Sequence, residues 1–203
     1  FGMYGSNSKN YGDGFTTMYG ANHEDIAYSY RTGNHGDGSW YSINGNIDYQ
    51  RTSRKNKQRM ITFSYKINTQ PQTSNSNTGY EDIHAKEEVD DLVKRLLLKN
   101  SQSDGKTNTM EQTFQVDYTT PIGELHTVEA GAKYIFRRNT SDNKLYEAAG
   151  GSDDYLYNED RSSDYRHLNH ILAAYLGYTL KYKDFTFKPG CLLYTSPSPR
   201  DRT

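Results

Sequence analysis

The sequence is poor in the features that mark a compact soluble core, a helical membrane protein or a nucleic-acid-binding protein. Only 33% of its 203 residues are hydrophobic, which is low for a protein that buries a large core. No stretch approaches the 18 apolar residues of a transmembrane helix. The net charge is −1, so nothing in the charge balance indicates a nucleic-acid partner. No signal peptide is recognisable and the first residue is Phe1, so we expect the chain to begin inside a longer reading frame.

Tyrosine, by contrast, is abundant. It occurs 19 times, against 7 Phe and 1 Trp, and so rich an aromatic content opposes disorder. Tyrosine combines an apolar ring with a polar tip, which suits a surface that is partly apolar and partly wet. The composition therefore indicates a folded chain with an amphipathic surface.

Several segments alternate apolar and polar residues with the period of a β-strand. The clearest lie at 41–49, 61–68, 113–119, 128–136 and 172–180, and a tight turn at 183–184 leads into 185–188. Period-2 alternation places all apolar residues of a strand on one face. The predicted outward, lipid-facing residues are Ile43, Ile47, Tyr49, Ile61, Phe63, Tyr65, Phe114, Val116, Tyr118, Val128, Ala130, Ala132, Tyr134, Phe136, Leu172, Ala174, Leu176, Tyr178 and Leu180.

Short and long connections alternate between these segments. The links at 52–57, 121–124 and 182–184 are short, whereas those at about 70–110 and 139–166 are long and rich in Ser, Asn, Asp and Gly. Outer-membrane barrels have short periplasmic turns, longer extracellular loops and strands of about 9–11 residues. The sequence thus predicts an all-β antiparallel meander of the transmembrane-barrel type, with long extracellular loops. We expect Tyr118 to pair with Val128 across the turn at 121–124.

The positions of the tyrosines favour the membrane interpretation over a soluble sandwich. Tyr41 and Tyr49 bracket one outward face, and Tyr118, Tyr134 and Tyr178 lie near strand ends. Aromatic girdles at the two membrane interfaces would produce this distribution. The alternative explanation is the ordinary preference of tyrosine for β-strands.

One segment has helical rather than β periodicity. Residues 86–99 carry Val89, Leu92, Val93, Leu96 and Leu97 at helical spacing, with acidic residues first and basic residues last. We expect one short amphipathic helix inside the long loop. Packing of this helix on its neighbours is favoured over a role as a lid or docking element.

Residues from about 40 to 190 resemble a known family. The stretches that carry the resemblance are NGNIDYQRTSRKNKQRMITFSYKINTQP, DYTTPIGELHTVEAGAKY and HILAAYLGYTLKYKDFTFKPG. They resemble outer-membrane β-barrel proteins of the TonB-dependent receptor type from Bacteroidota. The resemblance implies that the chain is an open fragment, a partial transmembrane barrel, of a large barrel with a plugged lumen in the cell outer membrane. It also implies a TonB system as the energy source. Membrane lipids, a plug and the remaining strands would be the partners of this chain.

The tail has a different character. Residues 191–201 read CLLYTSPSPRD, and they hold the only cysteine and two of the five prolines. This peptide resembles the translation of a transposase sequencing-library adapter. We therefore expect a native barrel portion at 1–190 and an adapter-derived artefact at 191–203. No redox or metal argument should then use Cys191.

No catalytic, cofactor-binding or metal-binding constellation stands out. His167 and His170 fall on opposite faces of a strand, which is a poor arrangement for joint metal binding. The acidic stretch 152–164 lacks EF-hand spacing and is interpreted as a solvated loop. We therefore predict no enzyme activity, no cofactor and no metal site.

Three functions remain open at this point. The first is part of a TonB-dependent receptor that takes up a ligand across the outer membrane. The second is an outer-membrane barrel that serves only as an anchor or adhesion platform, which a full-length gene without a plug would indicate. The third is a secreted β-sandwich that binds glycans, which would bury apolar residues between two sheets.

Overall fold

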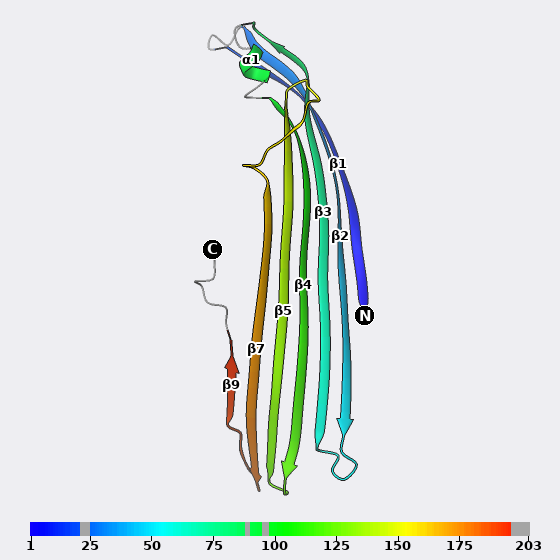
Figure 1. Ribbon diagram of the computed structural model, residues 1–203, viewed down its shortest axis with the longest axis vertical. Coiled ribbons are helices and arrows are strands. Elements are labelled where there is room, and N and C mark those ends of the chain that lie inside the picture. The colour runs from blue at the N-terminus through cyan, green and yellow to red at the C-terminus, as the bar shows by residue number, and fades with distance from the viewer. Residues whose placement is uncertain (21–24, 88–89, 95–97, 196–203) are drawn as a thin grey trace.

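The protein forms one open antiparallel sheet. A computed structural model describes residues 1–20, 25–87, 90–94 and 98–195. The long strands run side by side along the whole molecule (Figure 1). Their bounds are β1 Gly2–Tyr19, β2 Ile26–Thr52, β3 Met60–Ala85, β4 Lys99–Ile122, β5 His126–Ala149 and β7 Ser163–Tyr182. Short strands follow or flank them: β6 Leu156–Tyr157, β8 Phe185–Phe187 and β9 Gly190–Tyr194.

The sheet is a meander. Its strand order is β1-β2-β3-β4-β5-β7-β8, with β6 beside β5 and β9 beside β7. All pairings are antiparallel. Among the described residues, β1 forms one edge of the sheet. β8 and β9, which both lie beside β7, form the other edge, so the sheet is open. The predicted all-β antiparallel meander and partial barrel are confirmed.

The two ends of the sheet differ. Short turns join β2 to β3, β4 to β5 and β7 to β8 at the lower end in Figure 1, which we call the turn end. The connection from β3 to β4, which contains α1 (Asp90–Leu92), and the connection from β5 to β7 lie at the opposite end, called the loop end. At the turn end Gly123 has φ +67° and Lys183 has φ +52°, values that tight hairpin turns require.

The predicted strand lengths and loops need correction. Strands of about nine to eleven residues were expected, but β2 has 27 residues, β3 has 26 and β4 has 24. The segments expected to be long loops, 70–110 and 139–166, are largely strand. Thr69 to Thr78 of β3 pair without interruption with Ser101 to Met110 of β4. Alternation ends there because both faces are polar, yet backbone pairing between neighbouring strands does not depend on an apolar face.

The register at the β4–β5 turn also differs from the expected one. Tyr118 lies opposite Ala130, and Val128 lies opposite Thr120. Pro121 was assigned to the turn, but it remains in β4 opposite Thr127. The turn is therefore shorter and lies further along the chain, which shifts the pairing by two residues and leaves the faces unchanged.

The predicted helix is only partly within the described residues. α1 comprises Asp90–Leu92, and Val93 beyond it is 1% exposed. Val89, Leu96 and Leu97 lie outside the described residues. Val93, Leu98 and Ala148 are the buried apolar side chains of the described part of the chain. The only conventional core described is thus a small cluster at the loop end.

Candidate functional site: the two faces of the sheet

The predicted lipid-facing residues share one face, which we call the apolar face. Directly opposite residues on antiparallel strands point the same way. One row across the sheet is Ile47, Tyr65, Phe114, Tyr134 and Leu172; the next is Tyr49, Phe63, Val116, Ala132 and Ala174; a third holds Ile61, Tyr118, Ala130 and Leu176. Ile43, Phe136, Val128, Tyr178 and Leu180 extend the same face. That these side chains contact lipid stays a prediction.

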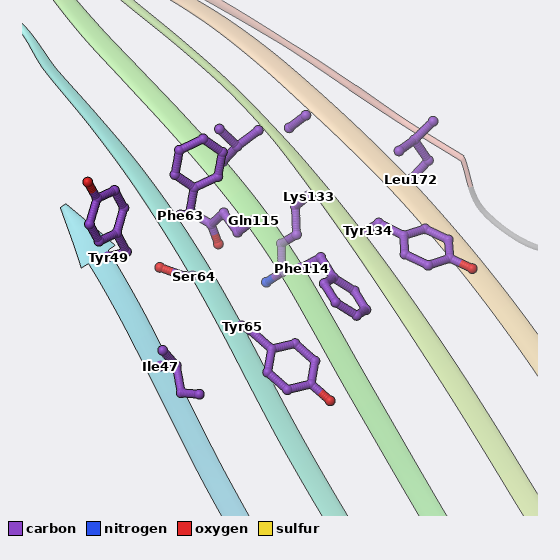
Figure 2. A pocket seen from close by; sticks show the side chains of 12 residues that line it. Ile47, Tyr49, Phe63, Ser64, Tyr65, Phe114, Gln115, Lys133, Tyr134 and Leu172 are labelled. Carbon is purple, nitrogen blue, oxygen red and sulfur yellow. The ribbon is translucent and has the colours of Figure 1, made fainter. Parts of the chain in front are cut away.

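Several of these side chains are exposed and form a hollow. Ile47 is 70% exposed, Leu172 55% and Phe63 48%. Together with Tyr49, Tyr65 and Phe114 they border an apolar hollow of about 470 Å³, with the rings standing out from neighbouring strands (Figure 2). Exposed apolar surface of this continuity is rare on monomeric soluble proteins and marks a membrane or interaction surface.

An aromatic row borders the apolar face toward the loop end. The rings of Tyr65 and Phe114 lie 4.8 Å apart, and those of Phe114 and Tyr134 lie 6.3 Å apart. The Tyr65 hydroxyl donates to Oε1 of Gln112 at 3.3 Å, and the Tyr134 hydroxyl lies 2.7 Å from Nδ1 of His170. Both partners stand nearer the loop end, so the tyrosine tips point there while the rings continue the apolar face. This is the orientation that an interfacial aromatic girdle requires.

The turn-end border has a similar arrangement. Tyr178 and His126 are joined by a hydrogen bond between the Tyr178 hydroxyl and Nδ1 of His126. From position 126 to position 136 a strand rises about 33 Å. With the usual tilt of barrel strands this span corresponds to a band about 25 Å tall, the height of the apolar belt of outer-membrane barrels. Beyond the loop-end border of this band, Arg138 lies on the same face of the sheet, between Met110 and Leu168 on the neighbouring strands.

The opposite face is polar and charged. Its row at mid-height consists of Asp48, Ser64, Gln115 and Lys133. Two rows toward the loop end on the same face, Arg137 forms an ion pair with Glu111 through Nε. A polar hollow of about 560 Å³ lies on this face, bordered by Asp48, Lys66 and Glu111 among others. We call it the polar face.

A glycine makes room for a contact on the polar face. Asp117, Gly131 and Tyr175 lie directly opposite one another on β4, β5 and β7. The Tyr175 hydroxyl donates to Oδ1 of Asp117 at 2.7 Å and so reaches across β5. A Cβ at position 131 would lie 2.3 Å from the Tyr175 ring. The close approach therefore requires glycine there.

No helix in the described part of the chain is long and apolar enough to cross a membrane. A comparison with protein families matches residues 52–191 to the outer membrane protein beta-barrel family. The match covers more than half of the chain. A comparison with curated proteins gives no match.

The chain belongs to the outer membrane protein beta-barrel family. Its location is therefore the outer membrane, as the sequence predicted. Barrels of this membrane have short turns on the periplasmic side and longer loops outside the cell. By this rule the turn end is periplasmic and the loop end is extracellular.

At the loop end, Glu147 anchors the connection between β5 and β7. Its carboxylate, 11% exposed, accepts a 2.7 Å hydrogen bond from Nδ2 of Asn158, pairs with Nη1 of Arg161 and lies 3.6 Å from Nζ of Lys99. The Asn158 hydrogen bond lowers the pKa of Glu147 most, burial opposes this, and the cations Lys99 and Arg161 lower it further. The short strand β6 pairs with β5 at the same place.

The histidines and the acidic loop do not form a site. His167 and His170 point to opposite faces, His170 toward Tyr134 and His167 beside Tyr165. Within residues 1–20, 25–87, 90–94 and 98–195, no three His, Cys, Asp or Glu side chains gather where a metal ion would bind. The absence of metal, cofactor and catalytic sites stays a prediction.

The sequence pattern did not identify the residues whose contacts depend on the register between strands. The contact between Tyr175 and Asp117 joins positions far apart in the sequence, and Gly131 looks like any other residue in an alternating strand. Glu147 was hidden in a segment expected to be a loop. The only available signal was the run of Ser, Thr, Asn and Gly, which can equally form a loop or a polar β-ladder.

Proposed function

We propose that this chain forms part of the wall of an outer-membrane receptor of the TonB-dependent type, which takes up a ligand across the outer membrane. The observation that carries the proposal is the polar face opposite the apolar face. Charged side chains such as Asp48, Lys66 and Glu111 line it at membrane height. In an outer-membrane barrel such a face borders an aqueous or plugged lumen.

The openness of the sheet supports a large barrel. The described strands leave two unpaired edges, and unpaired backbone groups are not tolerated in lipid. Further strands must therefore complete the wall, and membrane lipids and a plug are the proposed partners. Energy and gating come from the plug and a TonB system, whereas these residues supply wall, lumen lining and extracellular hairpins.

The chain's own role is passive, and we propose no enzyme activity, no cofactor and no nucleic-acid partner. The alternative function is an anchor or adhesion barrel, for which the extracellular extension of β2 and β3 is the supporting observation. A secreted glycan-binding sandwich is not retained, because the chain belongs to an outer-membrane barrel family and forms a single sheet.

Conductance of the complete protein tests uptake against anchoring. We expect large conductance steps in planar bilayers when the plug is deleted and small ones when it is present, together with binding to the periplasmic domain of TonB. A barrel that conducts equally with every upstream segment removed, and that does not bind TonB, would favour the anchor.

The tail carries a separate proposal. We propose that residues 191–203 derive from a sequencing-library adapter and are foreign to the receptor. In the structure β9 pairs with β7, with Cys191 opposite Leu176 and Leu192 opposite Tyr175. Leu192 and Tyr194 thus occupy polar-face positions, where β2 to β4 carry polar residues. The nucleotide sequence tests this: the adapter bases should begin at codon 191, and their absence would refute the proposal.

A further inference from the structure

A polar hollow of about 620 Å³ lies at the loop end, on the outer wall of the sheet. Its floor belongs to β2 and β3, where Gly33 lies directly opposite Gly79. Gly33, His35 and Ile43 are separated by even numbers of residues on β2, and the register with β3 is the same at Gly33 and at Ile43. The hollow therefore continues the apolar face and does not open into the lumen.

The hollow stands well outside the membrane. Position 35 lies about 26 Å along the strand from position 43, beyond the loop-end border of the apolar band. Because the loop end is extracellular, the hollow faces the cell exterior. Its volume lies in the range of small-molecule sites, about 300–1,000 Å³.

Two glycines border the hollow although neither their backbone angles nor their contacts with the described residues require glycine. Neither Gly33 nor Gly79 has a positive φ. Among the atoms of the described residues, a Cβ at Gly79 would meet none within 4 Å, and one at Gly33 would meet only Oδ1 of Asp13 at 3.8 Å. Glycine weakens a strand interior and often marks close approach of a ligand. The two paired glycines are therefore best explained by a ligand that approaches the backbone closely in this hollow.

The walls combine flat rings with amide and carboxylate groups. On one side the rings of Tyr11 and His35 lie 4.6 Å apart. The other side is formed by Asp153 and Tyr155, in the connection after β5. This connection is held in place by Nδ2 of Asn100, a side chain that donates to the Ser152 carbonyl at 3.0 Å.

The charges of the lining exclude an anionic ligand. Asp13, Glu81 and Asp153 border the hollow, and none of its described lining residues is Lys or Arg. Arg31 stands beside this border, 3.7 Å from Asp13 and directly opposite Glu81, so the three carboxylates still outnumber the one cation. Acidic walls repel phosphates and carboxylates. Burial and the nearby Asp153 raise the pKa of Tyr155, which keeps its hydroxyl a neutral donor.

We propose that this hollow is a binding site for a neutral oligosaccharide on the outer wall of the barrel, outside the lumen. Sugar hydroxyls donate to carboxylates and exchange hydrogen bonds with amides and phenols. The C–H faces of the sugar rings lie against Tyr11 and Tyr155, whose rings are apolar bodies with polar tips. The site is independent of the uptake function, because it lies on the other side of the wall.

The test uses the complete protein, folded in detergent and immobilised, with fluorescent maltohexaose, cellohexaose and mannohexaose as probes. Heparin and poly-lysine serve as anionic and cationic comparison probes. The variant Gly79→Val fills the hollow with a residue that strands favour. Gly14→Val is its matched control, because a Cβ at Gly14 also meets no atom of the described residues within 4 Å and Gly14 does not border the hollow.

We expect at least one neutral hexasaccharide to bind, Gly79→Val to weaken that binding about tenfold or more, and Gly14→Val to leave it unchanged. If Gly79→Val does not fold, as judged by heat-modifiable gel mobility, Tyr11→Ala replaces it, because Tyr11 is 73% exposed and its truncation spares the fold. Failure of every neutral probe to bind, equal binding by the Gly79 and Gly14 variants, or preference for heparin or poly-lysine would overturn the proposal.

Discussion

The hydroxyl of Tyr175 donates a 2.7 Å hydrogen bond to Oδ1 of Asp117, across the intervening strand β5. Gly131 lies directly between the two residues in the sheet. The side chains thus join β4 and β7 on the polar face, although the backbones of these two strands each pair with β5 and not with each other. The contact fixes the register of β7 against β4 at one point.

Gly131→Ala should destabilise the barrel. The added Cβ would lie 2.3 Å from the Tyr175 ring and 2.6 Å from Asp117 Oδ1, so the hydrogen bond must break or the strands must shift. Overpacking of this kind costs about 1–3 kcal/mol. Urea titration of the complete protein in liposomes measures the loss. Gly177→Ala is the control, because its Cβ comes no nearer than 3.6 Å to Glu129; equal losses in the two variants would contradict this explanation.

Ala132→Arg should impair assembly, whereas Lys133→Arg should not. Ala132 lies on the apolar face and Lys133 on the polar face of the same strand. An arginine at the bilayer midplane of a barrel costs about 2–4 kcal/mol, whereas an arginine in the lumen replaces a charge already present. Folded yield in liposomes, read by heat-modifiable gel mobility, distinguishes them. Similar yields would contradict the assignment of the two faces.

Glu147→Gln should loosen the connection between β5 and β7. The substitution removes the charge that pairs with Arg161 and Lys99, at an expected cost of about 1 kcal/mol. Hydrogen exchange of residues 156–162 measures the effect. Glu159→Gln, in the same connection, is the control. Unchanged exchange in the Glu147 variant would show that the ion pairs do not anchor this segment.

The same anchor should depend on pH. The pKa of Glu147 lies below its ordinary value of 4.5, so its stabilising contribution is complete above that value and is lost as the pH falls through the lowered pKa. Exchange of residues 156–162 should therefore accelerate, beyond its intrinsic pH dependence, only at pH below about 4.5. The Glu147→Gln variant should lack this acid step; an acid step of equal size in both proteins would assign it to another group.

The chain on its own should not be a stable monomer. Each edge of the sheet formed by the described residues presents unpaired N–H and C=O groups, and side chains such as Ile47 and Leu172 leave a continuous apolar face exposed. We expect aggregation or degradation when residues 1–190 are expressed alone. A monodisperse, detergent-free monomer that unfolds cooperatively in calorimetry would refute the membrane interpretation.

The sequence predicted the structure correctly where apolar and polar residues alternate, and less well elsewhere. From Val128 to Phe136 the period of two identified both the strand and its faces, because lipid and lumen impose opposite polarity on neighbouring positions. Outside the membrane that constraint ends, so the paired segments around Thr73 and Lys106 were interpreted as loops. Pro121 indicated a turn two residues too early, because proline is also accepted within a strand where its missing N–H is not needed. The contact of Tyr175 with Asp117 and the pairing of Gly33 with Gly79 depend on three-dimensional register, which local pattern does not specify.

The central claim is that alternate residues of one strand face lipid and lumen, and β5 tests it most directly. Single cysteines from position 128 to position 137 of the complete protein, in a background without other cysteines, would each carry a small fluorophore in liposomes. We predict quenching by nitroxide lipids at even positions, such as Ala132 and Tyr134, and by iodide at odd positions, such as Lys133. Quenching without a period of two, or lipid quenching at the odd positions, would contradict the account.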